Sequence, residues 1–88
     1  MLKYTIHTEN KNLRGIKDIL NNHLGYVGYT LNECKGAWKG KAEKSLKIEV
    51  LADHDLNVPI NSIAEQIRDR NKQDLVLVTV ENVEAILL

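Results

Sequence analysis

The stretch Cys34-Lys-Gly-Ala-Trp-Lys-Gly-Lys-Ala-Glu-Lys44 joins two segments that are predicted to be β-strands, and no helical pattern lies between them. It is longer than the roughly two to five residues that usually connect a β-hairpin, and it lacks the common Asn-Gly or Asp-Gly signal. It holds the only Trp and the only Cys of the chain, together with four lysines and two glycines. We therefore predict a long basic loop that displays an aromatic ring between the second and third strands.

The composition of this loop suits a flat anionic ligand such as a nucleotide. Trp38 provides a flat apolar surface with one N–H donor. Gly36 and Gly40 allow the backbone to bend or to approach a ligand closely, and the lysines provide positive charge. The alternative is a solvated hairpin whose Trp packs back against the core.

Periodic patterns outside the loop predict the remaining elements. Alternating or β-branched residues mark four strands, at 2–7, 26–34, 46–51 and 75–80. Apolar residues at helical spacing mark two helices, at 13–24 and 59–72. Asn10 or Asn12 is expected to cap the first helix, and Gly25 lies where a C-terminal cap glycine belongs. The apolar tail 83–88 is a candidate fifth strand.

The order strand, helix, strand, strand, helix, strand is typical of the α+β, ferredoxin-like fold. We expect a single domain over residues 1–88, with both helices on one face of a four-stranded antiparallel sheet. His7, Lys47 and Glu49 should share the other, open face if the first and third strands are neighbours. The last strand is apolar on both sides and is followed by the apolar tail. Because an open face normally alternates with polar residues, this pattern predicts a homo-oligomer.

The composition argues against several classes of protein. Lys plus Arg and Asp plus Glu number 12 each, so the formal net charge is zero, whereas a nucleic-acid binder usually carries a basic excess. One Cys cannot form an internal disulfide, and no apolar run approaches the ~20 residues that span a membrane. The N-terminus does not have the pattern of a signal peptide. We expect a cytoplasmic protein without membrane or nucleic-acid partners.

Catalytic and metal-binding patterns are weak. The three histidines, His7, His23 and His54, are scattered and do not have the spacing of a helical metal site. Cys34 is expected to face inward on a strand. No motif places a base beside a nucleophile, so we predict no catalytic residues, no metal and no cofactor. An enzyme that uses His7 or His54 as its acid–base group remains the alternative.

Four segments resemble the PII signalling proteins, a family that includes the CutA-type proteins. Gly28-Tyr-Thr30 through Glu33-Cys-Lys-Gly36 resembles the family's second strand, where a G-x-T pattern leads into a Gly-rich loop base. The segment 43–50 resembles the return strand. The segments 60–67 and 73–79 resemble the second helix and the fourth strand.

The resemblance implies a ferredoxin-like trimer that binds adenine nucleotides in clefts between subunits. It places Thr30, Lys35 and 36–39 near the cleft, and 70–73 on the facing loop. Two departures from the family are visible. The signalling loop is far shorter here, and Asn71-Lys-Gln73 replaces the Gly-rich phosphate loop before the last strand.

We therefore predict a non-enzymatic homo-oligomer, with three subunits favoured, that binds a small anionic nucleotide-derived ligand. It would sense this signal or sequester it, as small phage anti-defence proteins do. The predicted ligand-binding residues come from the basic loop and from the end of the second helix: Thr30, Lys35, Gly36, Trp38, Lys39, Gly40, Lys41, Arg70 and Gln73. The other alternative is a protein-interaction module that uses its last strand to extend a partner's sheet.

Overall fold

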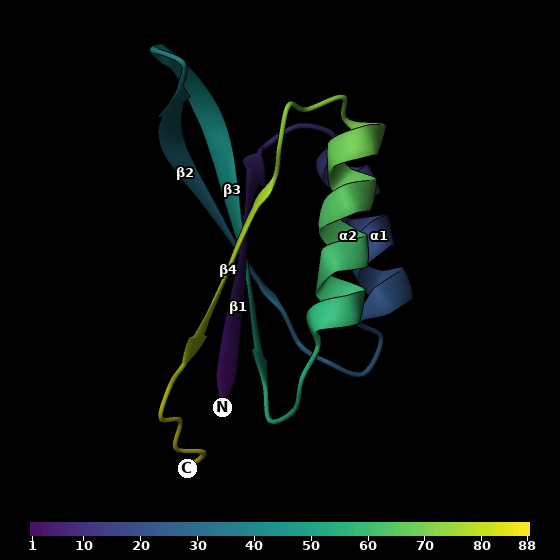
Figure 1. Cartoon of the computed structure of the whole chain (residues 1–88), viewed down its shortest axis with the longest axis vertical. Helices are drawn as coiled ribbons and strands as arrows, with labels where there is room; N and C mark the ends of the chain where they lie inside the picture. The colour runs from purple at the N-terminus through teal and green to yellow at the C-terminus, as the bar shows by residue number, and fades with distance from the viewer.

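The computed structural model describes all residues, 1–88, and forms one antiparallel sheet with two helices (Figure 1). The elements in chain order are β1 (Leu2–Glu9), α1 (Leu13–His23), β2 (Thr30–Trp38), β3 (Lys41–Ala52), α2 (Asn57–Arg70) and β4 (Leu77–Asn82). The strand order across the sheet is β2-β3-β1-β4, and every neighbouring pair is antiparallel. This layout confirms the predicted α+β ferredoxin-like fold. Neither helix is long and apolar enough to cross a membrane.

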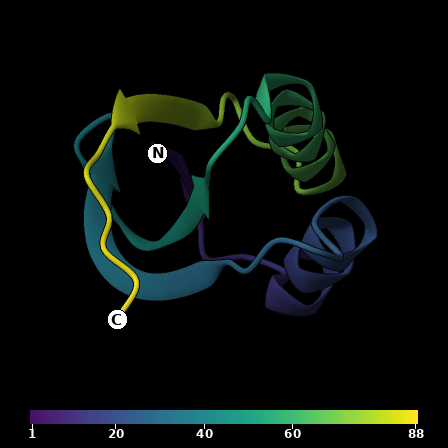
Figure 2. The ribbon, with the colours of Figure 1, turned by 90° about the horizontal axis from the view of Figure 1, so that it is seen from below.

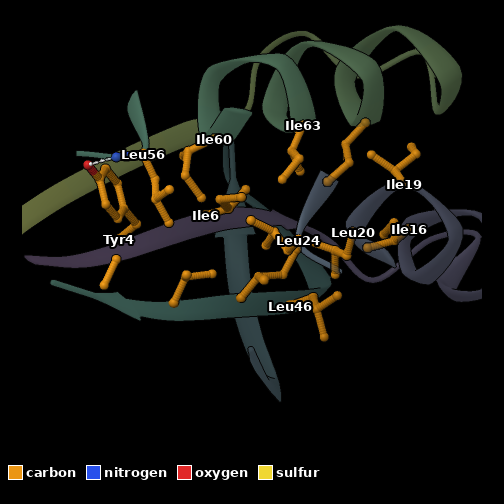
Figure 3. Close-up of a cluster of buried hydrophobic side chains, with 14 residues drawn as sticks. Tyr4, Ile6, Ile16, Ile19, Leu20, Leu24, Leu46, Leu56, Ile60 and Ile63 are labelled. Carbon is orange, nitrogen blue, oxygen red and sulfur yellow. Dashed lines mark hydrogen bonds between the residues drawn. The ribbon is translucent and has the colours of Figure 1, made fainter. Parts of the chain in front are cut away.

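Both helices lie on the same side of the sheet, which curves around them (Figure 2). Alternation along β1 and β3 turns Tyr4, Ile6 and Ile48 toward the helices, where each is almost fully buried. The core is one cluster of 14 buried residues between the sheet and the helices (Figure 3). The opposite side, which we call the open face, carries His7 directly across from Lys47, as predicted.

The N-terminus of α1 is capped by Asn12. The Asn12 side chain accepts a hydrogen bond from the backbone N–H of Gly15 at 3.3 Å. A Cβ atom at Gly15 would collide with the Asn12 amide, which explains a glycine within a helix. At the other end, Gly25 directly follows the cap residue Leu24, as predicted, but its φ is not positive, so it does not form the left-handed glycine cap. Leu24 is buried in the core, so side-chain burial holds the end of α1.

The N-terminus of α2 is held by a side chain from β1. The residue before the helix is Leu56, whose apolar side chain makes no capping hydrogen bond. Instead the buried Leu56 N–H donates to the hydroxyl oxygen of Tyr4 at 2.9 Å (Figure 3). The same hydroxyl donates to Oδ1 of Asn57 at 3.0 Å. Tyr4 therefore joins the central strand to the start of the second helix.

The predicted long loop 34–44 is instead a β-hairpin. β2 and β3 remain paired to their tips, where Trp38 lies opposite Lys41. A two-residue turn connects them, with φ 50° at Lys39 and 77° at Gly40. Positive φ at both turn residues is the geometry that matches the twist of a hairpin, and Lys-Gly achieves it here without the common signal.

Two other strand boundaries differ from prediction. β2 begins at Thr30 rather than at residue 26, because Thr30 is the first residue to pair with β3. β4 begins at Leu77, the first residue to pair with β1. The tail 83–88 is not a strand. Its Val83 N–H bonds the carbonyl oxygen of Met1 at 2.9 Å, and β1 offers no further residue with which to pair.

We expect Tyr4→Phe to lower the free energy of unfolding by about 1–3 kcal/mol, because it leaves the buried Leu56 N–H without an acceptor. Denaturant titration measures this loss. Tyr29→Phe is the matched control, since the Tyr29 hydroxyl makes one exposed bond to Asn21 at 2.8 Å. The control should change stability by less than about 0.5 kcal/mol. Equal losses in the two variants would show that Tyr4 does not hold α2.

Candidate functional site

The tip of the β2–β3 hairpin extends past the end of β1. Toward the hairpin tip, the pairing of β3 with β1 stops at Ser45, which lies opposite Glu9. Beyond it the two strands continue as a ribbon, at the end of the molecule away from the two chain termini (Figure 1). By strand alternation, Cys34, Gly36 and Trp38 lie on the same side as Ser45, which is the open face.

A groove of about 450 Å³ lies between this hairpin and the loop that connects α2 to β4. Its floor is the end of the open face, including His7 and Ser45. Trp38 lines the hairpin side, and Asp74 and Leu75 line the loop side. The volume falls within the range of about 300–1,000 Å³ that is typical of small-molecule pockets.

The α2–β4 loop is anchored by a buried amide. Asn71 is only 4% exposed. Its side-chain nitrogen donates to the carbonyl oxygen of Lys11 at 2.9 Å, and its side-chain oxygen accepts from the Asn12 amide at 3.2 Å. The segment 71–73 therefore begins with a structural contact between the end of α2 and the start of α1.

Gln73 anchors the next part of the loop to β1. Its side-chain nitrogen donates to the Thr8 hydroxyl at 2.7 Å. Its side-chain oxygen accepts from the Thr8 hydroxyl at 3.0 Å and from the Glu9 N–H at 3.3 Å. Gln73, a predicted ligand-binding residue, lines the groove, but these three bonds occupy its amide oxygen and one of its two N–H donors.

Asp74 bridges the groove to the hairpin tip. One carboxylate oxygen, Oδ2, accepts from the Trp38 indole N–H at 3.4 Å and from the Lys39 ammonium at 3.2 Å. We call these two contacts the Asp74 bridge. The hydrogen bonds from Lys39 and Trp38 hold the pKa of Asp74 below its ordinary value of 3.8. Trp38 stays 41% exposed and outside the core cluster, so the alternative of a core Trp is wrong.

Gly36 has a packing reason as well as its predicted role. A Cβ atom there would collide with the Ser45 hydroxyl, which lines the groove floor from the neighbouring strand. Any larger residue would have to displace this hydroxyl. The absence of a side chain at Gly36 therefore leaves space in the groove beside Trp38.

The charges around the groove are mixed. Its lysines are Lys35, Lys47 and Lys72, and its carboxylates are Glu9, Glu43 and Asp74. Strand alternation turns the Lys35 side chain to the other side of the ribbon, because its neighbours Cys34 and Gly36 face the groove. The groove of one chain therefore does not provide the strong positive field that the loop composition suggested.

The structure brings together only part of the predicted set. Lys35, Gly36, Trp38 and Gln73 line the groove, and Lys39 contacts Asp74. Five predicted residues do not line it, namely Lys39, Thr30 at the far end of β2, Gly40 and Lys41 at the tip, and Arg70 at the end of α2.

Several groove residues were not predicted. Glu9, Glu43 and Asp74 line it although no motif marked them. The position of Asp74 directly after Gln73, in the segment expected to face the loop, was the one available signal. Cys34, expected to face inward, is a half-buried thiol that also lines the groove.

His54 is not part of this site. It lies in the β3–α2 turn, where its Nδ1 is 2.7 Å from Oδ1 of Asp53. This contact lowers the pKa of Asp53, first through the hydrogen bond and then through charge attraction. His7 is therefore the histidine that an acid–base role in the groove would use. No group of three or more His, Cys, Asp and Glu side chains is arranged to hold a metal ion.

We expect the Asp74 bridge to open in acid. Because its pKa in the folded protein lies below 3.8, the bridge is intact above that pH and is lost as the pH falls through the lower folded-state value. Fluorescence of Trp38, the only Trp, reports the change directly, with circular dichroism to confirm that the fold persists. Asp74→Asn should lack this transition. The same transition in the variant would assign it to another group.

No protein-family model and no curated protein sequence matches the chain, but solved structures do. It is similar to CPII, a nitrogen regulatory PII-like protein from Thiomonas intermedia K12 bound to ADP, AMP and bicarbonate, with a TM-score of 0.66, 16% identity, and coverage of 99% of this chain and 93% of that one. CutA1 from Pyrococcus horikoshii gives a TM-score of 0.64 and 14% identity over 99% and 87%. A phage SAM lyase in complex with S-methyl-5′-thioadenosine gives 0.60 and 15% over 91% and 79%. These likenesses show that the chain has the ferredoxin-like fold of the PII-like and CutA1 proteins.

Proposed function

We propose that this protein binds a small anionic nucleotide-derived ligand without transforming it, in the groove between the β2–β3 hairpin and the α2–β4 loop. The observation that carries the proposal is a groove of about 450 Å³ with the single Trp on its wall. Two proteins of similar fold, at low sequence identity, have been solved with adenine-containing molecules. Fold alone does not establish function, so the proposal depends on the groove.

Trp38 is the proposed partner of the ligand's ring. It is 41% exposed, and its indole is held at the groove by the bond to Asp74. An aromatic side chain that is partly exposed and fixed in place can stack on a base with little loss of freedom. Leu75 and Leu77 on the opposite wall, each about half exposed, offer apolar contact to the ring.

The cations for the ligand's anionic group come from several elements. Lys47 and Lys72 line the groove of one chain. Lys41 and Arg70 are exposed and lie outside it. In the proposed oligomer, a neighbouring copy would bring such cations to the open side of the groove, so that the complete site lies between subunits.

Assembly is proposed because apolar side chains remain exposed on the sheet and the tail. Leu75, Leu77 and Val80 are 50–53% exposed, and the tail residues Ile86, Leu87 and Leu88 are 83–116% exposed. Exposed apolar surface of this kind marks interaction sites in soluble proteins. A trimer is the assembly we favour. Such a protein would either sense the ligand as a signal or sequester it. Sequestration of a defence signal would be the role of a phage anti-defence protein.

A small enzyme is the second candidate, on one specific observation. His7 lines the groove and lies directly opposite Lys47. One of the similar structures is a lyase in complex with S-methyl-5′-thioadenosine. Turnover of an adenosyl compound that disappears in His7→Gln and depends on pH would favour this candidate over simple binding.

Calorimetric titration with adenine mono-, di- and cyclic nucleotides tests the proposed function. We expect Trp38→Ala to weaken binding by about 5- to 150-fold, which corresponds to the loss of about 1–3 kcal/mol of base stacking. Trp38→Phe keeps a ring but loses the N–H donor, so its affinity should lie between those of the wild type and Trp38→Ala. Tyr26→Ala removes an aromatic ring that is fully exposed and does not line the groove, and it should bind as the wild type does.

A pair of lysine variants in the same titration tests the electrostatic part. Lys47→Ala should weaken binding at low salt and less so at high salt, because exposed charges are screened over about 10 Å at 0.1 M ionic strength. Lys44→Ala is the matched control, since Lys44 pairs with Lys35 on the other side of the ribbon. Wild-type affinity in Lys47→Ala at both salt concentrations would remove the cationic part of the site. Absence of binding to every nucleotide would refute the proposed function.

Native mass spectrometry of protein purified from cells tests the assembly. We expect a homo-oligomer, with three chains favoured, and a bound ligand mass that is consistent with a nucleotide derivative. Ligand retained after purification would favour sequestration over reversible sensing. A monodisperse monomer at micromolar concentration, confirmed by light scattering, would contradict the assembly and would favour the interaction module that extends a partner's sheet.

A further inference from the structure

We propose that Trp38 and Lys39 form an anion subsite at the tip of the β2–β3 hairpin, and that Asp74 fills it in the free protein in place of a ligand phosphate. The proposal rests on the proposed function for the identity of the ligand. It adds that the groove contains its own competitor, and that phosphorylated ligands are the ones able to displace it.

Two donors from adjacent residues converge on a single oxygen. The Trp38 indole N–H is 3.4 Å and the Lys39 ammonium 3.2 Å from Oδ2 of Asp74. The Lys39 nitrogen also lies 5.8 Å from the centre of the Trp38 ring. The turn that follows, with positive φ at Lys39 and Gly40, fixes the backbone of both donors. They are therefore arranged to hold an anion whether or not Asp74 supplies it.

Asp74 is free to leave this position without disturbing the loop. Asn71 and Gln73 make the bonds that anchor the loop, whereas Asp74 makes only the two contacts of the bridge. The side chains of Lys39 and Asp74 are 71% and 66% exposed. Exposed ion pairs contribute little to stability. Displacement of Asp74 by another anion therefore costs little free energy.

A phosphate is a stronger occupant than a carboxylate. A phosphate monoester carries a charge of about −1.5 to −2 at neutral pH and three acceptor oxygens, whereas Asp74 offers one oxygen to both donors. The hydrogen bonds that the Lys39 ammonium donates become stronger as the negative charge of the acceptor increases. The N–H lies at the edge of the indole, so phosphate at the edge leaves a ring face for the base. An uncharged nucleoside has nothing with which to replace Asp74.

Titration of AMP and adenosine against three proteins tests the displacement. We expect Asp74→Asn to bind AMP about 1.5- to 5-fold more tightly than the wild type, since an exposed pair of this strength no longer competes. Adenosine affinity should not change. Asp69→Asn is the control, because Asp69 forms a similar exposed pair with Arg68 at 2.9 Å on α2. Unchanged or weaker AMP binding by Asp74→Asn would overturn the role of Asp74 as a competitor.

Inorganic phosphate tests the subsite independently of any nucleotide. In Asp74→Asn, phosphate should change Trp38 fluorescence in a saturable manner, and Lys39→Met in the same background should abolish the response. Circular dichroism confirms that both variants are folded. A phosphate response without nucleotide binding would refute the proposed function and retain the subsite. No phosphate response in folded Asp74→Asn would overturn the subsite, whatever nucleotides do.

Discussion

The structure depends on the burial of one apolar layer on one face of a four-stranded sheet. β1 and β3 lie in the middle of the sheet and contribute Tyr4, Ile6, Leu46, Ile48 and Val50 to this layer. Both helices bury their isoleucines against it, so the whole core lies on the helix side (Figure 3). An 88-residue chain buries only about two-thirds of the surface of its unfolded chain. Since both helices pack on the same face of the sheet, no helix covers the other face. That face carries charged residues such as Lys47 and, at one end, the groove.

Two buried polar side chains connect the ends of the helices to the rest of the structure through hydrogen bonds. The Tyr4 hydroxyl holds the start of α2, and the Asn71 amide holds its end against the start of α1. Buried polar groups are costly unless they are paired, and each of these is paired with backbone as well as with a side chain. The loop after α2 is consequently fixed at both Asn71 and Gln73. This is what places Asp74 within reach of a hairpin that is distant in the sequence.

The groove is therefore a product of the hairpin and the loop together. Mixed charge is its main chemical property, since lysines and carboxylates both line it. A strongly basic cleft would attract any polyanion, whereas a groove of mixed charge suits the ligand that we propose, which combines a ring with a limited anionic charge. In our proposal, the Asp74 bridge would add a requirement for an anion that competes with a carboxylate.

The sequence by itself determined the order of the elements and the fold class. Periods of two and of about 3.6 residues are local properties, and they placed both helices and the alternation of His7 and Lys47 on the open face. The sequence failed at the stretch 34–44, because Lys39-Gly40 does not have the usual turn signal and the continued pairing depends on β3. It also failed to mark Glu9, Glu43 and Asp74, which are ordinary surface residues in any local pattern. Only the tertiary structure decided that Lys35 and Trp38 lie on opposite sides of the hairpin, that Gln73 and Asn71 are anchors, and that Asp74 contacts Trp38. These facts follow from strand register and from contacts between residues at least 35 positions apart, for which no short window of sequence contains the information.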